Sequence, residues 1–561
     1  MEYVIFGAGH NAASLIEYLQ KNGREPKYIV DNDENKWGSK ILGITVNPVS
    51  DLLTETGKNT HILISIENRD YYLQISSQLY EMGFQEEADF SDGLKLIHFA
   101  YDLPGKVSGD IRLPNGISAI KTFDRASRLF FTREPHRIFR GLYKGYSTES
   151  LKIIDLCRVN NLFNNYIVDT NVQRNKLNLP ADVILEHEYI DPVSYPFEWP
   201  PAMFCAYVDF MIDMIKKLTL SGIALIDAHA LNATFSKGKF LFLDFGALRL
   251  GVTPNTALLE FINTHIIPCI LFLKNQNEKA YLYLKNPGIE YTITDIKGYL
   301  KIQELNSFMK ILDRLKYVNA NEDVIAFMDE IYNFIHKLDR IAPETRWDNY
   351  QEDEWKWSPY KDKWSDKMRS VVSLIEMAHP STLIDLAGNM GWYGTALHEI
   401  IKHVTIMDWD YRCMNYLWKR ICLDGIKNVT PLYMSLISPT LDYYRDEMIG
   451  STGIMPWRKN AMRRFQADLA IALAIIHHLA FSQQLNFREI VGQLALYTNR
   501  YLIVEFVDQH DPYISDWIKA GFEWYSEENF VNELKNKFEI LSVHPSTPRQ
   551  TRKIYFCEKR V

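Results

Sequence analysis

Hydrophobic and polar positions follow the clearest pattern in residues 381–410, "STLIDLAGNMGWYGTALHEIIKHVTIMDWD". The short apolar run over 383–386 predicts a buried strand containing one acid, Asp385, and the turn "AGNMG" follows it. A helix is expected over about 392–401, and a second strand, "VTIMD", ends in Asp408. Strand, glycine turn, helix, strand and terminal acid form the pattern of a nucleotide-binding βαβ unit.

Short apolar segments continue to the end of the chain. Strands are predicted at 429–434, 467–473 and 501–507. The stretch 538–559, "FEILSVHPSTPRQTRKIYFCEK", predicts two strands joined by a polar connection that proline interrupts, hence a hairpin. This region is therefore expected to alternate strands and helices and to end in an antiparallel hairpin, which a plain dinucleotide-binding fold does not have.

Several motifs in one order resemble the bacterial nodulation-type methyltransferases, over roughly the last third to two-fifths of the chain. They are "WSPYKDKW", "LIDLAGNMG", "IMDWD", "ADLAIALAIIHHLAF" and "YLIVEFVDQHDP". The family carries a Leu-Asp-Leu-Gly-Cys-Asn-Thr-Gly turn, an Ile-His-His-Leu segment and an Ile-Glu-Phe-Val strand. The resemblance implies a class I methyltransferase fold, seven-stranded and Rossmann-like, with S-adenosyl-L-methionine as cofactor.

The cofactor is a sulfonium with an adenosine tail, so it needs close backbone approach and an acid for its ribose. Gly388 and Gly391 allow that approach, and Asn389 is placed to bond the amino-acid end. Asp408 is placed to accept from the ribose hydroxyls, and the neighbouring Trp409 to pack on adenine. We therefore expect the cofactor site to use these residues together with Asp385 and Ala387.

Two positions depart from the family pattern. Ala387 replaces the first glycine of the turn, which is tolerated if that residue keeps a negative φ. Ser435 stands where relatives carry an acid after the third strand, which affects the adenine contacts. An inactive Rossmann-like layer is therefore the alternative interpretation.

Methyl transfer to oxygen or nitrogen relies on positioning and on a base that removes the acceptor's proton. The candidate bases follow the fourth and fifth predicted strands: His477, His478 and Glu505, with Asp508 and Asp511 further out. The histidine pair is equally consistent with a packed, backbone-bonded pair, and we expect one functional and one structural histidine. Glu505 lies among apolar neighbours in mid-strand, so its carboxylate must be paired or perturbed.

The middle block contains "SGIALIDAHALNATFSKGKFLFLDFGAL", residues 221–248. Asp227 and Asn232 lie five residues apart, and Asp244 opens "DFG" after a predicted strand. This spacing resembles protein-kinase-like phosphotransferases, which implies a catalytic Asp227 that orients a hydroxyl, and magnesium held by Asn232 and Asp244 with ATP.

This block also departs from the kinase pattern. "LID" replaces the usual His-Arg-Asp, and His229 replaces the usual lysine. Residues 117–180 contain no clear glycine-rich loop, and Lys144 with Glu149 is only a guess for the lysine–glutamate pair. Nodulation-type methyltransferases carry a related segment, so this lobe is alternatively an inherited scaffold that holds substrate.

The first block opens "YVIFGAGHNAASLIEYL" and reaches "YIVDND" at 28–33. Gly7, Gly9 and Ala12 precede a predicted helix, and Asp31 ends the next strand. The block resembles the small Rossmann-type domains of polysaccharide and sugar-modifying enzymes. That resemblance implies a nucleotide or nucleotide-sugar ligand, or a role in assembly alone.

Composition narrows the functional classes. The 561 residues are 47% hydrophobic and 24% charged, and the net charge of −8 argues against a nucleic-acid binder. A basic pair at Arg463 and Arg464 is most consistent with a solvated face. The six cysteines form no C-x-x-C pair and predict reduced thiols. The chain opens without a secretory signal, and its longest apolar run, 467–481, is too short to cross a bilayer. We expect a cytoplasmic protein without a membrane span.

Together these features predict an α/β multidomain protein with a Rossmann-like domain at 1–115, a kinase-like α+β domain at 117–345 and a methyltransferase domain at 350–561. A linker is expected at 101–116, and the tryptophan-rich tract from Pro343 is expected to be a surface connection. The predicted activity is methyl transfer to a hydroxyl or amine of a sugar, surface-glycan precursor or secondary metabolite. The alternatives are a kinase-like phosphotransferase with an accessory methyltransferase fold and a non-catalytic nucleotide-binding scaffold. The oligomeric state stays open, a homo-oligomer included.

Overall fold

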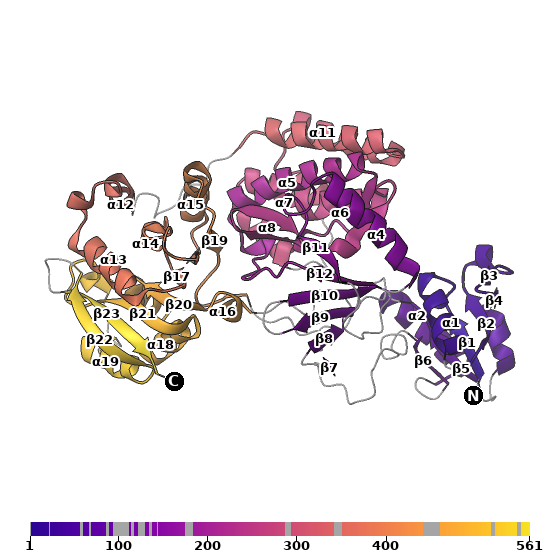
Figure 1. Ribbon diagram of the computed structural model, residues 1–561, viewed down its shortest axis with the longest axis horizontal. Coiled ribbons are helices and arrows are strands. Elements are labelled where there is room, and N and C mark those ends of the chain that lie inside the picture. The colour runs from indigo at the N-terminus through magenta and orange to yellow at the C-terminus, as the bar shows by residue number, and fades with distance from the viewer. Residues whose placement is uncertain are drawn as a thin grey trace. The chain divides into compact units, whose positions relative to one another are not determined.

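The computed structural model describes residues 2–21, 23–55, 60–66, 69–85, 89–93, 111–113, 117–121, 129–133, 137–142, 144–173, 183–285, 293–340, 351–440, 460–517, 522–546 and 551–560. These residues fall into two compact units (Figure 1). One contains the described residues within 1–147 and 171–187, and the other those within 148–170, 188–443 and 458–561. The middle block is thus shared between the units, and the three-domain division stays a prediction.

The N-terminal block forms a Rossmann-like sheet. Its strands are β1 (Glu2–Phe6), β2 (Pro26–Asp31), β3 (Lys40–Ile41), β4 (Ile44–Pro48), β5 (Thr60–Ile64) and β6 (Phe90–Asp92), in the order β3-β4-β2-β1-β5-β6. All pairings are parallel except β3 with β4. Helices α1 (His10–Lys21) and α2 (Arg69–Glu81) connect them, and a separate apolar cluster packs on each face of the sheet.

A second sheet of the same unit has the order β11-β12-β10-β9-β8-β7. It contains β7 (Ile111–Leu113), β8 (Ile117–Lys121), β9 (Leu129–Arg133), β10 (Arg137–Leu142), β11 (Thr170–Gln173) and β12 (Val183–His187). Helix α4 (Lys144–Val159) joins β10 to β11 in the chain. The predicted linker 101–116 lies outside the described residues except for β7.

The rest of the middle block is mostly helical. The long helix α5 (Pro201–Leu220) precedes two antiparallel strand pairs, β13 (Ile223–Leu225) with β16 (Leu248–Leu250) and β14 (Ala233–Ser236) with β15 (Lys239–Phe242). Helices α6 (Asn255–Phe261), α7 (Ile267–Leu273), α8 (Asn277–Lys285), α9 (Ile293–Ile296), α10 (Ile302–Arg314) and α11 (Asn321–Lys337) follow. The helical stretch Asn255–Leu273 has the length and mean hydropathy, 1.7, of a membrane span, but 67% of it is buried, as in the core helix of a folded domain.

The C-terminal block forms one seven-stranded sheet. Its strands are β17 (Thr382–Leu386), β18 (His403–Asp408), β19 (Val429–Tyr433), β20 (Ala467–Ala472), β21 (Thr498–Val507), β22 (Phe538–Pro545) and β23 (Arg552–Lys559), in the order β19-β18-β17-β20-β21-β23-β22. The first five are parallel, and β23 runs antiparallel to both β21 and β22. The predicted terminal hairpin is confirmed.

Helices and apolar layers cover both faces of this sheet. They are α13 (Asp366–Ala378), α14 (Trp392–Thr395), α15 (Tyr411–Asp424), α16 (Ala461–Arg464), α17 (Ile476–Phe481), α18 (Phe487–Leu496) and α19 (Glu527–Lys535). The helix expected over 392–401 is shorter than predicted, because regular helix ends at Thr395 and turns follow.

Two interpretations of polar and aromatic tracts are wrong in part. In the described part of the tryptophan-rich tract, which contains α12 (Glu352–Trp357), residues 359–363 are exposed as expected, but Trp355 and Trp364 pack against the apolar core of the sheet. Arg464 is buried rather than solvated, because it forms an ion pair with the buried Glu198 and lies 4.3 Å from the ring centre of Tyr195. The two tryptophans and Arg464 are all at least partly withdrawn from solvent, although charged residues lie near them in the sequence.

Candidate functional site

The glycine turn after β17 forms a tight cradle. A Cβ on Gly388 would lie 2.7 Å from Ile406 and 2.8–2.9 Å from the carboxyl group of Asp385. Gly391 adopts φ = +86°, and a Cβ there would lie 2.7 Å from Leu417. Only glycine fits both positions, because the turn packs closely on Ile406, Asp385 and Leu417.

Ala387 adopts φ = +59°. The sequence-based condition of a negative φ at this position is therefore wrong. The left-handed region brings an alanine Cβ close to the carbonyl oxygen, at a cost of about 1–2 kcal/mol. The turn keeps its shape despite the missing glycine, and the strain is stored beside the candidate cofactor site.

Asp408 ends β18 and is bonded to the turn. Its Oδ2 accepts from the backbone N–H of Asn389 at 2.8 Å, and its Oδ1 accepts from that of Asp410 at 2.9 Å. Burial raises the pKa of Asp408 to about 6. The adjacent Trp409 is 64% exposed, as expected for a ring available to a ligand. At the end of β19, the hydroxyl of Ser435 accepts from the backbone N–H of Ile437 at 3.3 Å.

Asp385 is a second buried acid in this region. It is 2% exposed and accepts from the backbone N–H of Gly394 at 2.9 Å. Burial, with a smaller contribution from the charge of Asp408, raises its pKa to about 7. The carboxyl edge of β17 and β18 therefore holds two acids whose charge burial disfavours.

Asn389 offers an acceptor to a ligand. Its amide Nδ2 lies 3.3 Å from the sulfur of Cys413, and its Oδ1 is buried with no hydrogen-bond partner. S-adenosyl-L-methionine carries a sulfonium and an ammonium group, so two buried acids and a free amide oxygen match its positive charges. With the glycine cradle, these residues fit that cofactor.

The two candidate histidines differ in burial. His477 is 1% exposed, and burial lowers its pKa to about 2, so the imidazole is neutral at physiological pH. His478 is half-buried, with its ring 4.3 Å from that of His477 and 5.1 Å from that of Trp517. Both lie on α17 directly after β20.

The candidate carboxylates near β21 are all bonded. Glu505 is fully buried and accepts from Lys367 Nζ at 2.7 Å, from the backbone N–H of Ala474 at 2.9 Å and from the Ser546 hydroxyl. Burial opposes its charge, but Lys367 and these donors leave its pKa below the ordinary value.

Further out, Asp511 holds Arg552 through two bonds of 2.9 and 3.1 Å, which lower the pKa of Asp511 to about 2 against the effect of burial. Asp508 accepts from His510. A carboxylate with a lowered pKa is a weak proton acceptor, so Glu505 and Asp511 are suited to holding structure in place.

Sequence reasoning missed Lys367 and Gln351. Gln351 is 5% exposed, and its Oε1 accepts from the backbone N–H of Trp392 at 3.3 Å, just after the glycine turn. Gln351 belongs to the tract interpreted as a surface connection, and Lys367 follows that tract at the start of α13. The tryptophan density of the tract could have drawn attention to this region, because three tryptophans in ten residues rarely stay in water.

The kinase-like residues of the middle block come together in part. Asn232 Nδ2 donates to Asp227 Oδ1 at 3.1 Å, and Asp244 Oδ1 accepts from the backbone N–H of Gly246 at 2.8 Å. His229 accepts from the backbone N–H of Leu231 through Nδ1 and, because it is buried, has a lowered pKa. Among the described residues no group of three or more His, Cys, Asp or Glu could hold a metal ion.

The structure places Lys144 and Glu149, the guessed lysine–glutamate pair of this block, on helix α4. Lys144 begins α4 and does not lie on a strand. Glu149 accepts from the backbone N–H of Leu250 at 2.9 Å, next to β16.

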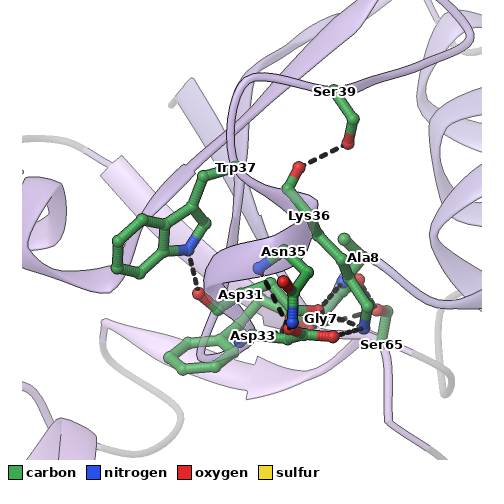
Figure 2. A network of polar contacts seen from close by, with 10 residues as sticks. Gly7, Ala8, Asp31, Asp33, Asn35, Lys36, Trp37, Ser39 and Ser65 are labelled. Carbon is green, nitrogen blue, oxygen red and sulfur yellow. Dashed lines mark hydrogen bonds and ion pairs between the residues drawn. The ribbon is translucent and has the colours of Figure 1, made fainter.

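Figure 2 shows the polar contacts of the N-terminal turn, where Asp31 makes two backbone bonds like those of Asp408 at the C-terminal turn. Asp31 ends β2 and accepts from the backbone N–H of Ala8 at 2.6 Å and from that of Asp33 at 2.8 Å. Gly7 adopts φ = +105°, and a Cβ there would lie 2.6 Å from Ile66, whereas Gly9 faces open space. Unlike Asp408, Asp31 has a cation beside it: Lys36 Nζ lies at 3.1 Å and, with the backbone donors, leaves the pKa of Asp31 lowered despite burial.

Comparison with known proteins shows a relative that matches most of the chain. The nodulation protein NoeA of Rhizobium meliloti (strain 1021) is 22% identical over 498 residues, which are 81% of this chain and 96% of NoeA. No family model matches the chain.

Solved structures resemble a part of the chain. The N-methyltransferase NodS from Bradyrhizobium japonicum WM9 is 10% identical over 35% of this chain and 96% of NodS, with a TM-score of 0.25. The magnesium protoporphyrin IX methyltransferase from Synechocystis PCC 6803 with bound SAM is 13% identical over 38% of this chain and 93% of its own, with a TM-score of 0.26. The bifunctional kinase-methyltransferase WbdD is 11% identical over 36% of this chain and 41% of its own, also with a TM-score of 0.26. The names of all three structures describe methyltransferases. The function of this chain is inferred from its own residues.

Proposed function

We propose that this protein transfers a methyl group from S-adenosyl-L-methionine. The observation that carries the proposal is Asp408, held by the glycine-turn amide at 2.8 Å at the carboxyl end of the second strand of the seven-stranded sheet. Ligands of open α/β sheets bind outside the carboxyl ends of the strands, and an acid at this position accepts from ribose hydroxyls.

The chain's residues divide the remaining work. The cofactor supplies an electrophilic methyl group when bound. Asp408 holds the ribose, Asn389 Oδ1 accepts from the ammonium group, and Trp409 packs on adenine. His478 removes the acceptor's proton: of the two candidate histidines it is the less buried, whereas the low pKa of His477 makes that ring a poor proton acceptor.

The proposed acceptor is a hydroxyl or amine on a sugar, surface-glycan precursor or related secondary metabolite. The resemblance of the N-terminal block to domains of sugar-modifying enzymes supports this class. Under this proposal the enzyme works in the cytoplasm, and the N-terminal domain binds a nucleotide or nucleotide sugar at Gly7, Gly9 and Asp31.

The direct test is binding of S-adenosylhomocysteine by calorimetry to the wild type and to Asp408→Ala. The variant loses hydrogen bonds to a charged acceptor, worth about 1.5–3 kcal/mol, so its affinity should fall by about 10- to 100-fold. Asp31→Ala is the matched control, because Asp31 makes the same two backbone bonds at the other turn. Unchanged affinity in Asp408→Ala, or a loss in Asp31→Ala alone, would contradict the site as proposed.

A second candidate function is magnesium-dependent phosphotransfer by the middle block. The bond from Asn232 Nδ2 to Asp227 Oδ1 supports it, because it brings together the proposed catalytic acid and one proposed magnesium ligand. If the lobe is active, Asp244→Asn should abolish magnesium-dependent ATP binding in calorimetry. A wild-type protein that binds no ATP in the presence of magnesium would exclude this function and favour a scaffold role for the lobe.

A further inference from the structure

Lys367 lies at a junction of three elements near the glycine turn. It is the second residue of α13, and its Nζ is 2.7 Å from Glu505 Oε2 on β21. The same ammonium lies 5.6 Å from the ring centre of Tyr393, on the helix that follows the turn. Its side chain is 16% exposed and that of Glu505 is 0% exposed, so the ion pair is almost completely withdrawn from water.

The charge of Lys367 reaches the candidate cofactor site. Burial raises the pKa of Asp385, on β17, and the charge of Lys367 opposes that rise. Burial lowers the pKa of His477, after β20, and the charge of Lys367 adds to that decrease. Glu505 Oε2, which accepts from Lys367, also accepts from the backbone N–H of Ala474, directly after β20. The ammonium therefore lies at the carboxyl ends of β17, β20 and β21.

This place is on the other side of the turn from the proposed ribose site. Asp408 ends β18, and the strand order β18-β17-β20-β21 puts the turn after β17 between Asp408 and Glu505. A ligand whose ribose lies at Asp408 and which crosses the turn extends its other end toward β20 and β21. In the proposed cofactor, that other end is the amino-acid part.

The amino-acid part carries an ammonium and a carboxylate. Asn389 Oδ1 suits the ammonium, but Asp385 and Asp408 disfavour a carboxylate unless a cation compensates for them. A lysine ammonium presents three N–H donors, so its bond to Glu505 does not exclude a bond to a ligand. We propose that Lys367 binds the carboxylate of the cofactor's amino-acid part and that Glu505 is the positioning residue that holds the lysine there.

This inference rests on the proposed function, and its test compares two ligands. S-adenosylhomocysteine has the carboxylate, and its decarboxylated analogue lacks only that group. In calorimetry, Lys367→Met should weaken S-adenosylhomocysteine by about 10- to 100-fold, the range of a charged hydrogen bond, and leave the analogue unchanged. Lys367→Arg keeps the charge and should retain most of the affinity.

A second variant separates anchoring from folding. Lys367→Met leaves the buried Glu505 without its cation and can destabilise the domain. The double variant Lys367→Met, Glu505→Gln removes both charges and should still bind S-adenosylhomocysteine weakly and the analogue normally. Glu505→Gln alone should keep the preference for the carboxylate-bearing ligand in part.

Three results would overturn the inference. They are equal losses for both ligands, no loss for either ligand, and recovery of S-adenosylhomocysteine affinity in the double variant, which would show a purely structural pair. Failure of the proposed function looks different, because folded wild-type protein would then bind neither ligand.

Discussion

At the scale of single residues, the candidate site combines strain, buried charge and an amide oxygen without a partner. Ala387 holds a left-handed backbone that glycine would adopt freely, and Asp385 and Asp408 are acids with raised pKa values. Each of these costs folding free energy in the absence of a ligand. Under the proposed function, the positive charge of the bound cofactor offsets the electrostatic part of this cost.

Neighbouring substitutions in the turn should have opposite effects. Ala387→Gly removes the strain of a Cβ at φ = +59° and should raise the free energy of unfolding by up to about 1 kcal/mol, after allowing for the more flexible unfolded chain. Gly388→Ala places a Cβ 2.7 Å from Ile406 and should destabilise the domain. Denaturant unfolding of both variants measures the difference, and a destabilised Ala387→Gly would show that the alanine is not strained.

Cofactor affinity should depend on pH through the two acids. Their pKa values, about 6 for Asp408 and about 7 for Asp385, lie above the ordinary value, so both become protonated as the pH falls toward 5. Protonation removes the capacity of these acids to accept hydrogen bonds from the ligand's ribose hydroxyls and ammonium group. Affinity for S-adenosylhomocysteine should therefore fall as the pH decreases through this window.

The unliganded protein should show the opposite trend. A raised pKa in the folded state means that the folded protein binds protons more readily than the unfolded chain. The contribution of these two acids to stability is therefore fully present below about pH 4 and is lost as the pH rises through 6 to 7. In Asp408→Asn, the changes near pH 6 in S-adenosylhomocysteine affinity and in the free energy of unfolding should both disappear. Calorimetry at several pH values measures the affinity, and denaturation at the same pH values measures the stability.

At the scale of elements, the pattern of apolar segments predicted the positions of the strands along the chain better than the ends of the helices. The terminal hairpin follows from two strand-forming segments around a proline-broken connection. The helix after the glycine turn ends early, at Thr395, because its length is set by packing against the sheet and by the preceding tract. Helix α12 was not predicted, because charged residues separate its tryptophans and hide the apolar pattern. The helix is fixed by packing of Trp355 against the core of the sheet.

Gln351 ties this tract to the helix after the turn. In Gln351→Leu the buried backbone N–H of Trp392 loses its side-chain acceptor, which should cost about 1–3 kcal/mol. Hydrogen exchange should become faster at Trp392 and in α14, while the amides of β21 keep their protection. Unchanged exchange at Trp392 would show that this bond does not hold the helix.

At the scale of the whole molecule, segments far apart in the chain are joined by buried charge within the larger compact unit. Arg464 Nη1 lies 3.0 Å from Glu198 Oε2 and also donates to the carbonyl of Val193 at 2.6 Å. Both side chains are at most 5% exposed. Such a pair is costly to bury but more costly to break.

Replacing one partner of this ion pair should reduce the stability of the unit more than replacing both partners. Arg464→Met leaves the carboxylate of Glu198 buried without its cation, so the unit should lose about 3–5 kcal/mol of stability. The double variant Arg464→Met, Glu198→Gln should recover much of that loss. Thermal unfolding with and without S-adenosylhomocysteine measures both effects, and equal stability of the single and double variants would contradict a coupled pair.

The sequence by itself determined the strands of the C-terminal sheet, the glycine cradle and the acid at the end of the second strand. These features depend on local periodicity and on backbone conformations that few residues allow. Only the tertiary structure decided which candidates are available for chemistry. His477 and His478 are neighbours in the chain, yet one is sealed and the other is half-buried. Glu505 acquires its cation from Lys367, a residue 138 positions away. Burial and pairing depend on contacts between distant segments, and these set the pKa values on which proton transfer depends.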